Sequence, residues 1–131
     1  MRTKKSLIFV TALLSMACAT LSAQQYRFVA GDNSIETKVC VLLGSNEIAK
    51  LKTTIRIKQL NKHHIANSYR CNDLALSKFA YKYHAADTFK YINRFSHHNN
   101  KVIPSVNITD IAMLRADENA APITVYVKTV Y

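Results

Sequence analysis

Glycine is scarce in this 131-residue chain, which contains only two, Gly31 and Gly44. A P-loop and a dinucleotide-binding Gly-x-Gly-x-x-Gly turn each need several glycines, because the backbone must approach phosphate closely. With only two isolated glycines, the chain can form neither of these two nucleotide-binding sites. The chain also lacks the His-Glu-x-x-His, Cys-x-x-Cys and Gly-x-Ser-x-Gly patterns, so it carries no signature of a zinc protease, a thiol oxidoreductase or a serine hydrolase.

Acidic residues are also few: eight Asp and Glu stand against 18 Lys and Arg, which gives a formal net charge of +10. A hydrolase that works with two carboxylates needs a pair of acids at its centre. No pair stands out, because several of the acids lie where helix caps or first-turn charges are expected. We therefore assign no catalytic residue, and a small envelope hydrolase remains an alternative. The eight acids are Asp32, Glu36, Glu47, Asp73, Asp87, Asp110, Asp117 and Glu118.

Long apolar runs are missing too. The apolar run that begins at Leu7 has about a dozen residues, fewer than the roughly 20 of a membrane-spanning helix. Three basic residues precede this run within the first five positions, and small residues follow it. This order predicts a signal peptide over residues 1–23, cleaved after Ala23, with Ala19 as the other candidate. An uncleaved N-terminal anchor and a lipoprotein attached through Cys18 are alternatives.

Residues 24–131 then form one small domain of 108 residues. They hold 15 basic and 8 acidic residues, a net charge of +7, and no further apolar run long enough to cross a membrane. A basic surface attracts polyanions, so the expected partner is an anionic envelope polymer, a lipid surface or another protein. The alternative is that the positive charge has no specific partner and only keeps a secreted protein soluble. The expected location is the periplasm or the medium.

Cysteine is scarce as well, with three in the chain. Cys18 would leave with the signal peptide, and Cys40 and Cys71 remain as an even pair in an exported chain, which predicts a disulfide. The bond would close a loop of about 32 residues and stabilise the fold by roughly 3–4 kcal/mol. A redox-active pair is the alternative, but such pairs usually have the Cys-x-x-Cys spacing.

The apolar pattern predicts a mainly α fold, a small helical domain with one disulfide and a short C-terminal β element. The residues 32–34 offer N-cap oxygens, Gly44 is a natural residue to follow a helix C-terminus, and Asn72 and Asp73 offer further caps. An apolar stripe with helical spacing runs from Leu76 to Tyr83. The expected helices are 35–43, 47–60, a short turn or helix within 61–68, and 76 to about 95 with a break near His84.

One strand is expected near the C-terminus, because β-branched residues alternate from Ile123 to Val130. A single strand needs a partner, and the candidates are 102–103 and 106–108. Residues 53–57 are also rich in β-branched side chains, so a strand is the alternative to the second helix there.

Five histidines are the candidate metal ligands, since a neutral imidazole binds transition metals. Adjacent histidines on a helix point about 100° apart, so each pair would supply one ligand, whereas a zinc site needs three or four. A metal-binding envelope protein is therefore an alternative, and solvent-exposed polar loops are the simpler interpretation. We assign no metal ligand and no cofactor. The candidates are His63, His64, His84, His97 and His98, with Asp73 or Asp87 as a carboxylate ligand.

Basic and aromatic residues interleave over residues 69–95. Lys78 with Lys82, and Lys90 with Arg94, are i, i+4 pairs away from the apolar stripe. Cations beside stacking aromatic rings would suit single-stranded nucleic acid. The alternative places the rings in the core and the lysines on its solvated outer face. The basic residues of the second expected helix do not align as one stripe, which argues against a helix lying on a membrane.

Several short motifs follow one another along the chain: Phe28-Val29-Ala30, Asp32-Asn33-Ser34, Val39-Cys40, Tyr69-Arg70-Cys71-Asn72, Phe79-Ala80 and Asp110-Ile111-Ala112. With these motifs, over residues 28–112, the chain resembles a family of small exported bacterial proteins of unknown function that share two cysteines. Small residues such as glycine often stand in that family where this chain has Asp73 and His84, which leaves the turn geometry open there. The resemblance implies an exported, disulfide-linked, mainly helical domain, and it implies no activity and no functional residues.

The expected function is therefore that of a non-catalytic, exported, small basic module that binds a partner or an anionic surface. Salt-dependent binding to an anionic polymer or lipid would support this hypothesis. Stoichiometric bound metal would support the metal-binding alternative, and turnover abolished by one Asp or Glu substitution would support the hydrolase.

Overall fold

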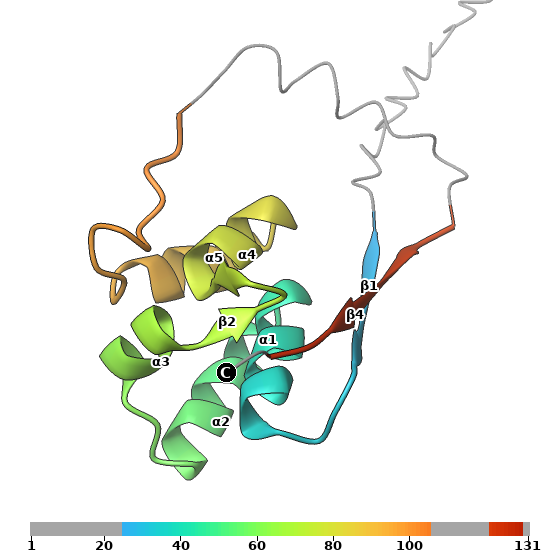
Figure 1. Cartoon of the computed structure of the whole chain (residues 1–131), viewed down its shortest axis with the longest axis horizontal. Helices are drawn as coiled ribbons and strands as arrows, with labels where there is room; N and C mark the ends of the chain where they lie inside the picture. Colours follow the sequence, from blue (N-terminus) through green and yellow to red (C-terminus); the bar gives the residue numbers. More distant parts are fainter. Residues whose placement is uncertain (1–24, 106–120, 130–131) are drawn as a thin grey trace, which may run out of the picture.

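The computed structural model describes residues 25–105 and 121–129, which form a mainly α domain with two short sheets (Figure 1). The predicted signal peptide, with both candidate cleavage sites, and the motif at 110–112 lie outside the described residues. Among the described residues, no helix is long and apolar enough to cross a membrane. The elements in chain order are β1 (Tyr26–Ala30), α1 (Ile35–Gly44), α2 (Ile48–Ile57), α3 (Lys62–Ser68), β2 (Arg70–Cys71), β3 (Leu74–Ala75), α4 (Leu76–Lys82), α5 (Ala86–Asn93) and β4 (Ile123–Val127).

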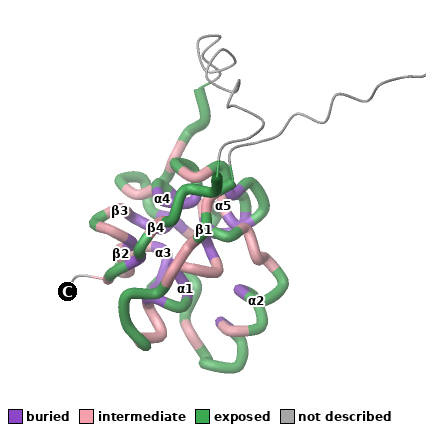
Figure 2. Tube along the Cα trace, turned by 90° about the vertical axis from the view of Figure 1, so that its right-hand side faces the viewer, coloured by how far each residue is buried: buried purple, intermediate pink, exposed green. Residues whose placement is uncertain are grey.

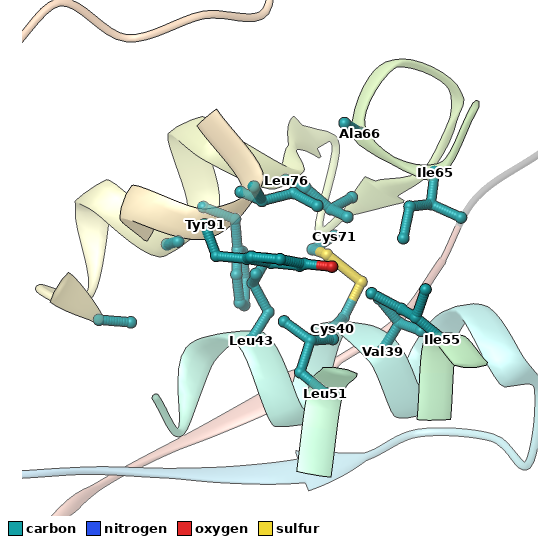
Figure 3. Close-up of a cluster of buried hydrophobic side chains, with 14 of the residues drawn as sticks. Val39, Cys40, Leu43, Leu51, Ile55, Ile65, Ala66, Cys71, Leu76 and Tyr91 are labelled. Carbon is teal, nitrogen blue, oxygen red and sulfur yellow. A yellow bond between two sulfur atoms is a disulfide. The ribbon is translucent and has the colours of Figure 1, made fainter. Parts of the chain in front are cut away.

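The described helices surround a core that contains the disulfide (Figure 3). Cys40 on α1 and Cys71 on β2 are joined, with their Cα atoms 5.6 Å apart, and both residues are fully buried. The predicted mainly α fold with one Cys40–Cys71 disulfide is thereby confirmed. Side chains from all five of these helices share the core with the disulfide, among them Val39, Leu43, Leu51, Ile55, Ile65, Leu76, Phe79 and Ile92.

Helix α1 begins where the sequence predicts. The Ser34 hydroxyl caps it and accepts a hydrogen bond from the Thr37 N–H at 3.1 Å. The Asp32 carboxylate accepts hydrogen bonds from the Ser34 hydroxyl and N–H, which lower the pKa of Asp32 below its usual value of 3.8. Gly44 ends α1 instead of following it, without a positive φ. A Cβ there would lie 2.6 Å from the Phe28 ring, so the close approach of β1 requires glycine at this position.

Helices α1, α2 and α4 end in the same way. The residue after each C-cap takes a positive φ, and the next N–H bonds back to the carbonyl five residues earlier, which is the Schellman motif. The positive-φ residues are Asn46 (56°), Gln59 (51°) and His84 (56°). The reversing hydrogen bonds run from Glu47 to Leu42 at 3.0 Å, from Leu60 to Ile55 at 2.9 Å and from Ala85 to Ala80 at 2.9 Å.

These ends decide the helix boundaries. Helix α2 ends at Ile57, short of the predicted residue 60, and the alternative strand at 53–57 is wrong because those residues are helical. The predicted break near His84 is confirmed, because it separates α4 from α5. The expected short helix within 61–68 is α3, whose first N–H groups are capped by the Asn61 side chain.

A hairpin of β2 and β3 follows α3. Asn72 and Asp73 form its turn with φ of 48° and 66°, the combination that a two-residue type I′ turn needs. The prediction that they cap a helix is wrong, since α4 begins at Leu76 without a side-chain cap. Asp73 and His84 are the two positions where the resembling family often has small residues. Both take the positive φ that glycine adopts without strain.

The C-terminal strand is confirmed as β4, but both predicted partners are wrong or outside the described residues. Residues 102–103 form no strand, and 106–108 are not described. The partner is β1, which pairs with β4 in parallel over five residues. The sequence analysis did not predict β1. The two strands lie together at one side of the helices, at the right in Figure 1, where Phe28 contacts the Phe79 and Tyr83 rings.

The other edge of β4 is held by one side chain. The Asn72 Nδ2 donates to the Tyr126 carbonyl at 2.9 Å, and its Oδ1 accepts from the Lys128 N–H at 2.8 Å. The Asn72 N–H also donates to the Lys128 carbonyl at 3.0 Å. The hairpin next to Cys71 therefore joins the C-terminal strand to the disulfide-linked core.

Candidate functional site

An open groove of about 720 Å³ lies between α2, the start of α3 and α5. Its buried residues, Ile55 and Tyr91, belong to the core, whereas most of its polar residues are exposed. Figure 2 shows exposed residues on the outer side of α2, with the buried positions turned toward the other helices. The groove is lined by Ala49, Lys52, Thr53, Ile55, Arg56, Gln59, Leu60, Lys62 and Tyr91.

Three cations line the groove from two helices, and a fourth lies beside it. Lys52 and Arg56 lie one helical turn apart on α2, and Lys62 is the first residue of α3. Arg94 follows α5 directly and lies over the Tyr91 ring, 5.7 Å from its centroid. These four residues, Lys52, Arg56, Lys62 and Arg94, are called the groove cations below.

Two aromatic rings organise the groove cations. The Tyr91 and Phe95 rings are in edge contact, with their centroids 5.4 Å apart. The Lys52 Nζ lies 5.3 Å from the centroid of Tyr91, and the Lys62 Nζ lies 5.5 Å from that of Phe95. Because a cation is attracted to the face of an aromatic ring, these rings hold three of the four cations near the groove.

The groove cations have no anionic neighbour within the described part of the chain. None of the residues that line the groove is acidic. Within residues 25–105 and 121–129 the one ion pair is Lys50 with Glu47, at 2.9 Å, which does not involve the groove. Four positive charges without a compensating carboxylate repel one another, so the binding of an anion between them is favourable.

Tyr91 adds a neutral polar group to this charged surface. The residue is only 8% exposed, yet its hydroxyl has no hydrogen-bond partner among the described residues. Figure 3 shows the ring extending from α5 into the core cluster, with the hydroxyl pointing toward the side where Ile55 lies. Ile55 and Tyr91 both line the groove, so the groove lies directly against this part of the core.

The histidines do not gather into a metal site. The segments around two of them lie close together, because the His63 ring contacts Phe95 at 5.3 Å and the His97 N–H donates to Asn67 on α3. Among the residues that the structure describes, however, no three His, Cys, Asp or Glu side chains come close enough to hold an ion. The metal-binding alternative therefore gains no support.

The described carboxylates that make contacts lie at helix termini. Asp32 bonds to the cap of α1, Glu47 pairs with Lys50 near the start of α2, and Asp87 accepts a hydrogen bond from the Asn46 side chain at 3.0 Å. These contacts hold each acid in a local structural role. The arrangement adds no support for the hydrolase alternative.

The interleaved segment 69–95 is divided between core and surface. Phe79 is fully buried, which agrees with the core interpretation of the aromatic residues. The Arg70 guanidinium donates to the carbonyls of Asn67 and Tyr69. Of the two basic pairs in this segment, only Arg94 lies beside the groove, over the Tyr91 ring. The sequence analysis did not identify the groove, because Lys52 and Arg94 come to the same ring only through tertiary packing.

Comparison with known proteins gives one finding. Residues 39–113 match the model of a family described as "Protein of unknown function (DUF3718)". The matched segment spans more than half of the chain and contains both disulfide cysteines and all residues that line the groove, whereas β1 and β4 lie outside it. No curated protein and no solved structure matches the chain.

Proposed function

The chain belongs to the DUF3718 family of unknown function, and we propose that it is an exported, non-catalytic module that binds an anionic partner in the groove. The observation that carries this proposal is the set of four groove cations around Tyr91 and Phe95, with no acid among the lining residues. An anion in the groove would relieve the repulsion among these charges. The surrounding positive potential would also attract it from a distance.

Export is part of this proposal. The order of charged, apolar and small residues at the N-terminus supports it, and a disulfide persists most readily in an oxidising compartment such as the periplasm or the medium. The test is the intact mass of the protein isolated without reductant from the exported fraction. A mass equal to residues 24–131 less two hydrogens supports cleavage after Ala23. A lipid-sized increment on a chain beginning at Cys18 would replace this proposal with a lipoprotein.

Binding is tested with a matched pair of double variants. Lys52→Gln with Arg56→Gln removes two groove cations, and Lys78→Gln with Lys82→Gln removes two exposed cations at the same i, i+4 spacing on α4. Both variants lower the net charge equally. The probe is inorganic polyphosphate, and its binding is measured by titration calorimetry at several salt concentrations. We expect the groove variant to bind about 30-fold more weakly, at roughly 1 kcal/mol per cation.

The α4 variant is expected to keep its affinity within about threefold, because each of its charges lies outside the groove. Backbone amide shifts on titration should map to α2, α3 and α5. If both variants lose affinity equally, binding is a general effect of positive charge and the groove is not the site. If the wild-type protein binds no polyanion at any salt concentration, the proposed function is wrong.

A further inference from the structure

We infer that the occupant of the groove is a linear acidic polysaccharide, an inference that rests on the proposed function and names the class of its ligand. The groove is open to solvent; Lys52 and Arg56 of α2 and Lys62 of α3 line it, and Arg94, after α5, lies beside it over the Tyr91 ring. A polymer bound there would meet positive charge from all three of these segments.

Two of the groove cations are arginines, and this favours oxyanions such as carboxylate, sulfate or phosphate. The planar guanidinium fork of Arg56 or Arg94 matches two oxygens of one such group. Lys52 and Lys62 supply point charges that accept less defined geometry. Successive acidic groups of a polymer could therefore each pair with one of the groove cations, and the polymer would not need to bind in one fixed position along its length.

Neutral hydrogen-bonding groups lie among the charges. Thr53, Gln59 and Tyr91 line the same groove, and no side-chain hydrogen bond joins any of the three to the rest of the described chain. Hydroxyl and amide groups can each donate and accept hydrogen bonds. A sugar polymer offers many hydroxyls to such groups, whereas a simple polyanion such as polyphosphate offers none.

Single-stranded nucleic acid fits the groove less well. Its binding surfaces usually present exposed aromatic rings on which bases stack. Here Tyr91 is only 8% exposed, and Lys52 and Arg94 already lie over its ring, while Lys62 and Arg94 lie over Phe95. A base could stack on these rings only by displacing the cations that would hold its phosphates.

A membrane surface also fits less well. A protein that rests on a bilayer buries apolar side chains beside its cations. The described large apolar side chains with high exposure are Ile57, Tyr81, Ile103, Ile123 and Tyr126, and none of them lines the groove. On α2, Leu51 and Ile55 are buried in the core and Ile57, at the end of the helix, is the one highly exposed large apolar side chain, so this helix has no broad free apolar face.

The experiment compares five probes on the disulfide-linked protein at matched ionic strength: polygalacturonate, inorganic polyphosphate, oligothymidylate, an abasic sugar-phosphate chain of equal length, and vesicles of phosphatidylcholine with phosphatidylglycerol. The decisive variant is Thr53→Ala with Gln59→Ala, which leaves every charge in place. We expect this variant to bind polygalacturonate about tenfold more weakly, because hydrogen bonds to sugar hydroxyls are lost, and to bind polyphosphate within about twofold of wild type. Circular dichroism and thermal unfolding check that the variant is folded.

Each other result overturns the inference. Equal affinity of wild type and the Thr53→Ala, Gln59→Ala variant for polygalacturonate would show that the sugar hydroxyls are not recognised. Tighter binding to oligothymidylate than to an abasic sugar-phosphate chain of equal length would reveal base stacking and replace the polysaccharide with nucleic acid. Groove-dependent binding to the vesicles alone would replace it with a lipid surface. In all three cases the polyphosphate result still decides the proposed function separately.

Discussion

Asparagine side chains connect segments of this protein that are distant in sequence. The Asn46 Oδ1 accepts from the N–H groups of Asp87 and Thr88 at 2.9 and 3.1 Å, and so it caps α5, which has no cap of its own. Asn93 both donates to and accepts from the backbone of Val102. A carboxamide carries a donor and an acceptor on one short side chain, and can therefore pair with the N–H and carbonyl of an open backbone segment.

Asn72 combines this role with a backbone role, and the two can be separated by substitution. Asn72→Ala removes the two side-chain hydrogen bonds, to the Tyr126 carbonyl and from the Lys128 N–H, and places alanine at a φ of 48°. We expect a loss of about 2–3 kcal/mol in the free energy of unfolding, from the hydrogen bonds and the left-handed backbone together. Urea unfolding measures the loss, and amide exchange at Lys128 should become faster.

Asn72→Gly is the control, because glycine takes a positive φ freely but makes no side-chain hydrogen bonds. Its expected loss is about 1–2 kcal/mol, smaller than that of Asn72→Ala. If neither substitution speeds amide exchange at Lys128, the Asn72 side chain does not hold β4.

At the scale of the elements, three helices end in a Schellman motif without glycine. Asn46, Gln59 and His84 take positive φ values between 51° and 56°, a conformation that costs an L-residue roughly 1 kcal/mol or more relative to glycine. The two glycines of the chain lie elsewhere, and Gly44 is required by the approach of Phe28. The backbone is therefore strained at these three helix ends. At one of them, His84, the resembling family often has a small residue such as glycine.

This strain predicts that two substitutions stabilise the protein. Gln59→Gly and His84→Gly should each raise the free energy of unfolding by about 1 kcal/mol, because glycine adopts the required φ without a Cβ penalty. Thermal or urea unfolding measures the gain. His84→Gly leaves the groove unchanged, so it should also keep the affinity for polyphosphate.

Asn46→Gly is the matched comparison. It relieves the same backbone strain, with φ of 56°, but it removes the side chain that caps α5. The lost cap costs about 1 kcal/mol, so the net change should be near zero or destabilising. A gain at Asn46 as large as at His84 would show that the side-chain cap contributes nothing.

At the scale of the whole molecule, the disulfide joins the first helix to the hairpin that holds the last strand. Cys40 and Cys71 are 31 residues apart in sequence, and Asn72 follows the second cysteine directly. Through Asn72 the same hairpin is bonded to β4, and β4 pairs with β1. Both ends of the described chain are thereby linked to the core around one covalent bond.

The disulfide is expected to contribute a large share of the total stability. Cys40→Ala, Cys71→Ala and the double variant should each lower the free energy of unfolding by a similar amount, roughly 3–4 kcal/mol, because all three remove the same loop closure. Urea unfolding without reductant measures the three values, and thiol titration of the native wild-type protein should find neither Cys40 nor Cys71 reactive. Clearly unequal single variants would mean that one cysteine has a further role.

Local patterns in the sequence predicted much of the fold. The Ser34 region as a helix start, the break near His84 and the Cys40–Cys71 pairing follow from capping, spacing and composition, which act over a few residues or leave only one pairing open. The turn at Asn72 was misread as a cap, because asparagine favours helix starts and type I′ turns alike.

The sequence by itself determined that this is a basic, mainly helical domain with one disulfide, since charge, periodicity and cysteine number depend little on tertiary contacts. Only the tertiary structure decided that β4 pairs with β1, that Asn46 and Asn72 bond to distant backbone, and that Lys52 and Arg56 share a groove with Lys62 and Tyr91. The physical reason is that the local sequence of many segments would allow them to form each of these contacts. The choice among them is made by the packing of the whole core around the disulfide.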